Sequence, residues 1–521
     1  MIPVKNKNFY EGIAYNAEKS PEKVLLTVAE EQITYDEFMI HTKEIAKALR
    51  KSGVSCNDKV GMVISNSTQW YEIFWAAVRI GAQPVPMDPQ SGKLELERLL
   101  QYADIRICFF TELYRGNHIA EHMKELRIQN SQITRFIFID GGKKGDGYGF
   151  QSFQDFIEEG RKEKEEASYQ PESGHVMSLA CTSGSTGNPK ILSVPYEGFY
   201  DAILDMSDYL GFTGQDLMMI GMPLYHQGGF GMGLQTVIKG GSVIYQPQFE
   251  PESFLKTIQE RKVTIIQLTS TLAKILLSHP DFYQYDLSSV KVCYFAGEVL
   301  PKEIAAVFVE KFHIRVINVI GSSETATMVV WDSDKDYDVD PSDFKPLPFT
   351  EVCVIDEDGN ETELGELEVY TTAVIYNYYG NEEETKSRVV TKNGKRCFRT
   401  GDLVKRLPDG RIRFVGRKKR IIKRGANLVH AEEVEGFLLM HPRIEAVAVT
   451  AQDHEVIGQE IVAYVQTSDN RPITRIEIAK YFKGKLSAYK IPDRIVMTDD
   501  LPHDIGKIQF KYIREQQRKE H

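Results

Sequence analysis

The sequence predicts an α/β protein with more than one domain. A chain of 521 residues is too long for a single hydrophobic core, and its hydrophobic content of 42% is ordinary for a globular protein. Strand and helix patterns alternate early in the chain, with a strand at Val60–Ile64, an amphipathic helix at Trp70–Ile80 and a further strand at Gly81–Met87. This β-α-β alternation predicts parallel strands that are covered by helices.

Charge, cysteine usage and hydropathy exclude several classes of protein. The formal net charge of −11 argues against nucleic acid or an anionic membrane as the main partner. The six cysteines are scattered without C-x-x-C spacing, which indicates neither a zinc site nor a disulfide framework. No uninterrupted apolar run approaches 18 residues, and the polar N-terminus has no apolar signal core. We therefore expect a cytoplasmic protein with reduced thiols and no membrane span.

The most informative stretch is Cys181–Lys190, which lies between predicted strands at Val176–Ala180 and Ile191–Val194. Glycines let a backbone bend so that several N–H groups face one anion, hydroxyls add donors, and a lysine adds a mobile positive charge. This composition favours a loop that binds a polyphosphate over an ordinary Gly/Ser connection. The positions that supply these groups are Thr182, Ser183, Gly184, Ser185, Thr186, Gly187 and Lys190.

Two common nucleotide-binding motifs are absent from the sequence. A Walker A loop needs Gly-Lys followed by Ser or Thr, and the Gly-Lys pairs of this chain are each followed by another residue. No G-x-G-x-x-G occurs either. These absences disfavour ordinary P-loop NTPases and dinucleotide dehydrogenases.

Thr182–Lys190 resembles the phosphate loop of the adenylate-forming superfamily, which includes acyl- and aryl-CoA ligases, adenylation domains and luciferase. The resemblance extends over most of the chain. Phe295–Glu298 occupies the place of the family's adenine-flanking turn, and Val316–Thr325 resembles its Tyr-Gly-x-Thr-Glu block. The resemblance assigns the following residues of these two segments to the nucleotide: Ala296, Gly297, Glu298, Ile320, Gly321 and Ser322.

Within the second block, the resemblance implies catalytic roles for two residues. Ser323 replaces the family's Thr and keeps the hydroxyl that bonds an α-phosphate. Glu324 is expected to hold Mg²⁺, a hard cation that prefers carboxylate oxygens. Ile320 replaces the usual Tyr, so an apolar contact takes the place of aromatic stacking on adenine.

The acyl side of the expected site is marked by His226, which follows a predicted strand at Met218–Met222. The family has Pro-x-x-His here, beside the acyl substrate; the alternative is a structural histidine. The glycines that follow allow either room for a bulky acyl group or close helix packing. No acidic residue occurs between Pro223 and Gly241 to pair with a substrate ammonium, so we expect a simple carboxylic acid rather than an α-amino acid.

Two residues near the end of the large domain are implied to contact the nucleotide. The family uses the Asp at the position of Asp402 to accept hydrogen bonds from both ribose hydroxyls. Arg417 would approach the ribose or phosphates with charge-assisted bonds. Between them, Asp409-Gly410 is a hairpin signal flanked by strands.

Lys419 matches the family's hinge residue. The resemblance therefore divides the chain into a large, multi-subdomain N-terminal α/β domain (residues 1–417) and a small, mobile C-terminal α/β domain (residues 418–521). Lys507, in a Gly-Lys loop after Leu501-Pro, matches the catalytic lysine.

The resemblance implies a two-step enzyme that uses ATP, Mg²⁺ and coenzyme A. A carboxylic acid first forms an acyl-adenylate, and a thiol then takes the acyl group. The alternative is a free-standing adenylating enzyme that loads the phosphopantetheine thiol of an acyl or aryl carrier protein, and both alternatives share all of these residues. The frame of Arg424–Glu435 resembles aryl-acid adenylating relatives. A non-catalytic nucleotide-binding module is disfavoured because Lys507, Glu324 and Asp402 occur together.

Overall fold

The chain folds into two compact units, each built from several segments. The first unit comprises Met1–Glu250, Ser322–Thr327 and Thr371–Arg396, and the second comprises Pro251–Gly321, Met328–Tyr370 and Cys397–His521. The expected domain boundary between residues 417 and 418 falls inside the second unit and stays a prediction. This computed structural model describes residues 9–129, 132–140, 149–164, 169, 171–172, 174–182, 190–424, 427–454, 458–483, 486, 488–498, 501, 503–504 and 507–508.

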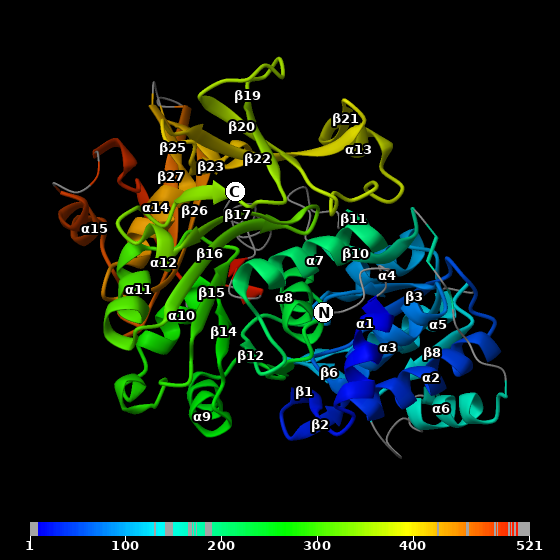
Figure 1. Ribbon diagram of the computed structural model, residues 1–521. Coiled ribbons are helices and arrows are strands. Elements are labelled where there is room, and N and C mark those ends of the chain that lie inside the picture. Colours follow the sequence, from blue (N-terminus) through cyan, green and yellow to red (C-terminus); the bar gives the residue numbers. More distant parts are fainter. Residues whose placement is uncertain are drawn as a thin grey trace. The chain divides into compact units, whose positions relative to one another are not determined.

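The first unit is built mainly on parallel strands, which confirms the α/β class (Figure 1). One sheet has the strand order β4-β3-β5-β8-β9, with parallel neighbours throughout. A second group has the order β12-β13-β1-β2, in which β1 and β2 are antiparallel. The elements of this unit are α1 (Phe9–Lys19), β1 (Val24–Val28), β2 (Glu31–Thr34), α2 (Tyr35–Lys51), β3 (Lys59–Val63), α3 (Thr68–Arg79), β4 (Gln83–Pro86), α4 (Lys93–Tyr102), β5 (Ile105–Phe110), β6 (Leu113–Tyr114), β7 (Asn117–His118), α5 (Ile119–Gln129), β8 (Arg135–Phe138), β9 (Gln151–Ser152), α6 (Phe153–Arg161), β10 (Val176–Thr182), β11 (Lys190–Pro195), α7 (Tyr196–Leu210), β12 (Leu217–Ile220), α8 (Gln227–Val237), β13 (Ser242–Tyr245), α13 (Glu382–Arg388) and β21 (Val389–Lys392).

The core of the first unit is rich in aromatic side chains. The helix expected at Trp70–Ile80 is present as α3, and the Ser67 hydroxyl caps it by accepting a hydrogen bond from the backbone N–H of Trp70 at 3.1 Å. On its buried face, Phe74 packs against Phe230 of α8 with ring centroids 4.4 Å apart. This packing fixes α8, the helix that begins directly after His226.

Helix α7 packs closely on the backbone of the segment that follows residue 371. A Cβ atom placed on Gly198 would lie 1.9 Å from the carbonyl oxygen of Thr372, and a backbone atom cannot rotate out of the way. We therefore expect Gly198→Ala to lower the free energy of unfolding by about 1–3 kcal/mol, as overpacked sites do. Urea denaturation of the purified variant measures this loss.

The matched control for this prediction is Gly436→Ala in a helix of the second unit. A Cβ atom at Gly436 has its nearest neighbour at 3.7 Å, which is an ordinary van der Waals contact. Alanine is also the better helix former, by about 1 kcal/mol. Equal urea midpoints for the two variants would contradict the close approach at Gly198.

The second unit joins parallel strands to an antiparallel extension. Strands β14, β15 and β16 are parallel, and the order continues through β17, β18, β23, β22 and β20 to β19. The hairpin expected at Asp409-Gly410 is confirmed, because β22 and β23 pair antiparallel and Gly410 has φ +85°. The elements of this unit are α9 (Pro251–Arg261), β14 (Ile265–Leu268), α10 (Ser270–Leu277), η2 (Phe282–Gln284), β15 (Val292–Ala296), α11 (Lys302–Ala306), η3 (Val307–Lys311), β16 (Arg315–Ser322), β17 (Ala326–Asp332), α12 (Ser333–Asp336), β18 (Asp343–Pro346), β19 (Glu351–Ile355), β20 (Leu364–Tyr370), β22 (Lys395–Arg406), β23 (Ile412–Arg417), η4 (Lys418–Arg420), β24 (Ile421–Arg424), β25 (Asn427–His430), α14 (Ala431–Leu439), β26 (Ile444–His454), β27 (Gly458–Thr467), α15 (Arg475–Phe482), η5 (Ala488–Lys490), β28 (Arg494–Met497), β29 (His503–Asp504) and β30 (Lys507–Ile508).

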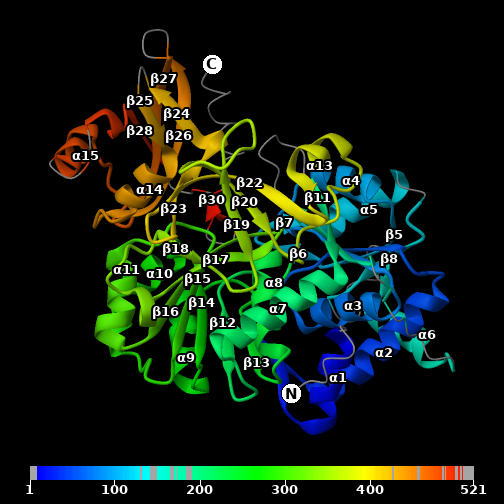
Figure 2. The same ribbon diagram turned by 45° about the horizontal axis from the view of Figure 1, so that its top comes forward.

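The C-terminal part of the second unit has its own sheet, in the order β25-β24-β27-β26, with β28 parallel to β27 (Figure 2). Its core is formed by side chains of this sheet and of helices α14 and α15. Members of this core include Val434, Leu438, Val447, Ile461 and Phe482.

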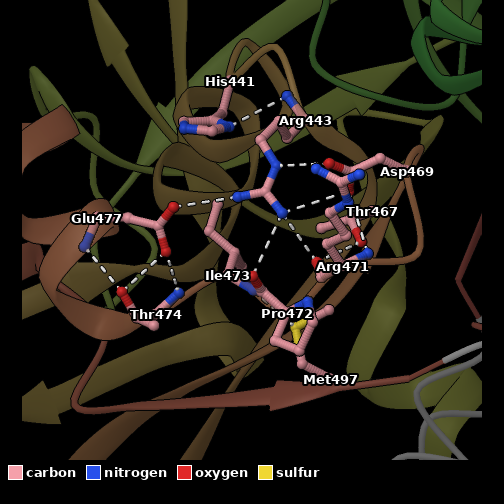
Figure 3. A network of polar contacts seen from close by, with 10 residues as sticks. All are labelled: His441, Arg443, Thr467, Asp469, Arg471, Pro472, Ile473, Thr474, Glu477 and Met497. Atoms are coloured by element: carbon pink, nitrogen blue, oxygen red, sulfur yellow. Dashed lines mark hydrogen bonds and ion pairs between the residues drawn. The ribbon is translucent and has the colours of Figure 1, made fainter.

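Arg443 fastens the connection between β27 and α15 (Figure 3). Its guanidinium donates to Asp469 Oδ2 at 2.9 Å, to Glu477 Oε1 at 3.0 Å and to the carbonyl oxygen of Arg471 at 3.0 Å. Thr474 and Glu477 also form a capping box at the start of α15. The planar guanidinium thus ties two residues of the connecting loop to the first turn of α15.

No helix in the described part of the chain combines the length and hydropathy that a bilayer crossing requires.

Candidate functional site

The predicted phosphate loop joins two directly paired strand ends. Strands β10 and β11 are antiparallel, with Thr182 opposite Lys190 and Cys181 opposite Ile191. The predicted loop therefore starts and ends at neighbouring positions of two paired strands. Both strands that the sequence predicts around the loop are confirmed. Five predicted loop residues lie outside the described residues: Ser183, Gly184, Ser185, Thr186 and Gly187.

The ammonium group of Lys190 is held by two side chains of the first unit. Its Nζ forms an ion pair with Glu384 of α13, whose Oε1 also lies 3.4 Å from Nε of Arg388. The same Nζ lies 5.1 Å from the ring centroid of Tyr378, within the range of a cation–π contact. Lys190 is 18% exposed, so its charge is partly desolvated and these contacts count for more than at a fully exposed site.

Tyr378 connects this lysine to the predicted metal ligand. The Tyr378 hydroxyl donates a hydrogen bond to Glu324 Oε1 at 2.9 Å. Burial, followed by the negative charge of Glu324, raises the pKa of Tyr378 well above its usual value, so the phenol keeps its proton and remains a donor. Lys190, Tyr378 and Glu324 therefore form a continuous chain of polar contacts.

The turn that carries Glu324 is fixed by its own backbone and by two hydroxyls. The Ser322 Oγ accepts from the backbone N–H of Glu324 at 3.2 Å and lies 2.9 Å from Thr325 Oγ1. The carbonyl oxygen of Glu324 accepts from the N–H of Ile375 at 2.9 Å. Ser323 lies in the same turn, between β16 and β17.

The donor set around Glu324 fits Mg²⁺ shared with a nucleotide. Among the described residues, no group of three or more His, Cys, Asp or Glu side chains is arranged to enclose a metal ion. Mg²⁺ is commonly held by one or two carboxylates and completes its shell with phosphate oxygens and water. A single carboxylate close to a phosphate-loop lysine matches this pattern.

His226 lies directly before α8 and caps its N-terminus. Its Nδ1 accepts a hydrogen bond from the backbone N–H of Gly228 at 3.1 Å, so in a neutral ring the proton sits on Nε2. Asn66 connects the segments that follow β12 and β13. Its side chain accepts a hydrogen bond from the Leu224 N–H at 2.8 Å and donates one to the Gln246 carbonyl at 2.7 Å. A structural role for His226 is thus present, and its role toward the substrate stays a prediction.

Two of the glycines after His226, Gly229 and Gly233, allow close packing. A Cβ atom on Gly229 would lie 2.2 Å from the carbonyl oxygen of Pro223, and one on Gly233 would lie 2.3 Å from the Tyr245 hydroxyl. That hydroxyl donates to the carbonyl oxygen of Gly229 at 2.9 Å. The space beside these two glycines is therefore filled by the protein itself.

In the second unit, the expected adenine-flanking turn follows β15. The Glu298 carboxylate accepts from the backbone N–H of Thr271 at 2.8 Å and from its hydroxyl at 3.0 Å. The side chain of Glu298 is thus engaged at the start of α10, which favours the backbone of this turn as the nucleotide contact. Gly297, at φ +93°, adopts a conformation that other residues rarely take.

Ala296 and Ile320 lie at the same edge of this unit's parallel strands. Ala296, the last residue of β15, pairs with Val319, and Ile320 and Gly321 lie in the part of β16 that continues past this pairing. Ligands of open α/β sheets bind outside the carboxyl ends of such strands. These residues are therefore well placed for the assignment that the sequence suggested.

Asp402 and Arg417 pair with each other across β22 and β23. Arg417 Nε lies 2.9 Å from Asp402 Oδ1, and the two residues are opposite in register. Asp402 is 2% exposed and Arg417 is 52% exposed at its side chain. A ribose that bonds Asp402 would share this carboxylate with the guanidinium.

The remaining two predicted residues are located by their backbone alone. Lys419 lies in η4, and Lys507 begins β30 opposite Asp504 of β29. The side chains of both lysines lie outside the described residues.

Sequence reasoning missed Tyr378 and Glu384. Glu384 meets Lys190 across 194 positions of the chain, and no local spacing rule links them. The connection depends on backbone pairing, since Tyr379 N–H donates to the Ile191 carbonyl at 2.8 Å and Asn377 bonds Ser193 through both backbone and side chain. In the sequence, the one feature that could have drawn attention to these two residues is the Tyr- and Glu-rich run in which they lie.

Known proteins match this chain over most of its length. Residues 13–379 match the family model of AMP-binding enzymes, and residues 433–505 match the AMP-binding enzyme C-terminal domain. The putative acyl-CoA synthetase YngI of Bacillus subtilis (strain 168) is 28% identical over 506 residues, which cover 92% of this chain and 91% of that protein. The 2,3-dihydroxybenzoate-AMP ligase of the same strain is 25% identical over 506 residues, covering 96% and 92%.

Solved structures agree on the fold. The anthranilate CoA ligase AuaEII, crystallised in complex with anthranoyl-AMP, superposes with a TM-score of 0.86 at 23% identity, covering 98% of this chain and 97% of that one. The first family match alone spans well over half of the 521 residues. The protein therefore belongs to the AMP-binding enzyme superfamily, is acyl-CoA ligase-like, and has a large N-terminal AMP-binding domain followed by a small C-terminal domain.

Proposed function

We propose that this protein uses ATP to activate an aryl or a medium- to long-chain acyl carboxylic acid and transfers the acyl group to the thiol of coenzyme A. The chain of contacts from Lys190 through Tyr378 to Glu324 supports the proposal most directly. It links an amine suited to phosphate, which follows a stretch rich in glycine and hydroxyl residues, to a carboxylate suited to Mg²⁺.

In the first step, a carboxylate oxygen of the acid attacks the α-phosphorus of ATP. The bond from this phosphorus to the bridging oxygen of the β-phosphate breaks, and pyrophosphate leaves. Thr182–Lys190 binds the β- and γ-phosphates, while Ser323 and Lys507 donate to oxygens at the α-phosphate. A bound Mg²⁺ on Glu324 would supply positive charge that neutralises the phosphate oxygens. The catalytic contribution is mostly positioning and charge stabilisation.

In the second step, the thiol sulfur attacks the carbonyl carbon of the acyl-adenylate. The bond from this carbon to the AMP oxygen breaks, AMP leaves, and the thiol proton passes to solvent. Rotation of the C-terminal domain about Lys419 withdraws Lys507 between the two steps, as a hinge movement.

The substrate is a simple carboxylic acid, because no acidic residue between Pro223 and Gly241 is present to pair with an α-ammonium group. The test is pyrophosphate release with ATP, Mg²⁺ and a panel of aryl, medium-chain and long-chain acids. Release with amino acids alone, or with none of the acids, would contradict the proposal.

A carrier-protein phosphopantetheine is the second candidate acceptor. The motif frame at Arg424–Glu435 favours it, as does similarity to a protein named as an aryl-acid AMP ligase. Once an acid is found, thioester formation with coenzyme A is compared with loading of a phosphopantetheinylated carrier. The acceptor with the larger kcat/KM identifies the second half-reaction.

Replacement of Glu324 by Gln tests the metal assignment. A neutral amide is a poorer ligand for a hard cation, so we expect a higher Mg²⁺ concentration to be needed for half-maximal pyrophosphate release. We also expect the rate of release to fall at least about tenfold, which corresponds to roughly 1.4 kcal/mol of barrier. Glu382→Gln is the matched control, because Glu382 is 88% exposed at its side chain and pairs with Lys386 at the surface of α13. An unchanged Mg²⁺ titration for Glu324→Gln would count against the assignment.

A further inference from the structure

Tyr378 contacts two groups of different chemistry at once. Its hydroxyl donates to Glu324 Oε1 at 2.9 Å, and the centroid of its ring lies 5.1 Å from Lys190 Nζ. Tyr378 is only 3% exposed, so both contacts are made largely out of water. The polar end and the aromatic face of one side chain thus serve separate partners.

The backbone of Tyr378 leaves its ring little freedom to move. Tyr378 forms a β-bridge with Leu192, two residues after Lys190, and its N–H donates to Thr385 Oγ1 at 3.0 Å. The following residue continues the pairing, since the N–H of Tyr379 donates to the Ile191 carbonyl. The ring is therefore fixed relative to the strand that carries Lys190.

Glu324 and Lys190, in contrast, have long side chains with several rotatable bonds. The phenol of Tyr378 donates a hydrogen bond to Oε1 of the Glu324 carboxylate. An ionised carboxylate has about four lone-pair sites, so this hydrogen bond is compatible with a cation on the same carboxylate. The ammonium of Lys190 has three donors, so it can keep its contact with Glu384 while it binds a phosphate oxygen.

We propose that Tyr378 is a positioning residue that sets the separation between the phosphate-binding amine of Lys190 and the Mg²⁺-binding carboxylate of Glu324. The inference rests on the proposed function, because it takes ATP and Mg²⁺ as the ligands of these two groups. The hydroxyl acts on the metal side and the ring acts on the phosphate side, so the two contributions are separable by substitution.

The test measures equilibrium binding of ATP to the full-length protein, first with EDTA and then across a Mg²⁺ titration. Tyr378→Phe keeps the ring and loses the hydroxyl. We expect its Kd for ATP without Mg²⁺ to stay within about twofold of the wild-type value. We expect the Mg²⁺ concentration that gives half of the full effect on ATP binding to rise about 10- to 100-fold, as for other residues that orient a metal ligand.

Tyr378→Leu removes both contacts. We expect the same shift in the Mg²⁺ titration and, in addition, a metal-free Kd for ATP that is weaker by about two- to fivefold, the loss expected from a cation–π contact. Tyr379→Phe is the matched control, because it deletes a neighbouring hydroxyl while its backbone hydrogen bonds remain. This control is expected to bind ATP and Mg²⁺ as wild type does.

An unchanged Mg²⁺ titration for Tyr378→Phe would overturn the inference, as would an equal weakening of ATP binding with and without the metal. Thermal melting of each variant checks that the fold is retained, and Tyr378→Phe preserves the buried ring that the core requires. The reaction itself is judged separately: wild-type protein that binds ATP with Mg²⁺ but releases no pyrophosphate with any acid would refute the proposed function and leave the binding comparison intact.

Discussion

Replacement of Lys507 by alanine is expected to abolish adenylate formation while it spares the second half-reaction. The amine acts only when it lies over the α-phosphate and the attacking carboxylate, where negative charge develops in the transition state. Loss of one such donor costs at least about 100-fold in rate, or roughly 2.7 kcal/mol. Thioester formation from a supplied acyl-adenylate is expected to stay within about threefold of wild type, or roughly 0.7 kcal/mol.

The measurement is pyrophosphate release for the first step and thioester formation from synthetic acyl-adenylate for the second. Lys511→Ala is the matched control, since it removes a lysine from the same C-terminal segment. An equal loss of both half-reactions in Lys507→Ala would show that this lysine does not act in one catalytic state alone.

The second large effect is expected at Lys419, where the structure anchors the chain on both sides. On one side, Lys418 Nζ lies 3.1 Å from Glu366 Oε2 of β20. On the other, Arg420 Nη2 lies 2.6 Å from Glu435 Oε1 of α14 and donates to the Val449 carbonyl at 3.1 Å. Lys419 is thus the residue between two fixed neighbours, as a pivot requires.

A rotation at this point would also break contacts between α10 and the end of α14. Lys274 Nζ donates to the carbonyl oxygens of Leu439, His441 and Ile444, of which the His441 contact is 3.2 Å long. The Leu439 carbonyl is the last of α14, a position where a cation is favoured, and the other two carbonyls follow the helix. Burial lowers the pKa of Lys274 to about 8, so the amine is still largely protonated at neutral pH.

Lys419→Pro is expected to spare adenylation and to impair thioester formation. Proline fixes φ near −65°, a value found in 3₁₀-helices such as η4, and it prevents the large change of backbone angle that a hinge needs. We expect the first step to survive within about tenfold, roughly 1.4 kcal/mol of barrier, and the second step to fall far more.

Half-reaction kinetics on the purified variant test this expectation, with Lys419→Ala as the control that removes the charge but leaves the backbone free. Lys419→Ala is expected to run both steps at close to the wild-type rates. If thioester formation keeps pace with adenylation in Lys419→Pro, the hinge lies elsewhere.

The sequence by itself determined the α/β class and the local elements around the nucleotide site. The strands β10 and β11, the helix α3 and the Asp409-Gly410 hairpin were predictable because hydrophobic periodicity and turn residues act over a few positions. The roles of residues such as Ser323 and Glu324 were predictable as expectations, because their spacing within one turn is also local.

Tertiary structure decided what those residues touch. The sequence left the glycines after His226 open to two readings, and the Pro223 carbonyl and the Tyr245 hydroxyl make Gly229 and Gly233 packing positions. For Glu298, which the sequence assigned to the nucleotide, the structure adds that its carboxylate accepts hydrogen bonds from Thr271. In each case the neighbour comes from another element.

The clearest example is the pairing of Lys190 with Glu384 and of Glu324 with Tyr378. These contacts join segments that lie far apart in the chain, and they exist because the residues around Tyr378 pair along β11. Local sequence propensity does not predict such long-range pairing. The favourable energy of an ion pair or a buried hydrogen bond appears only after the fold has brought both partners together out of water.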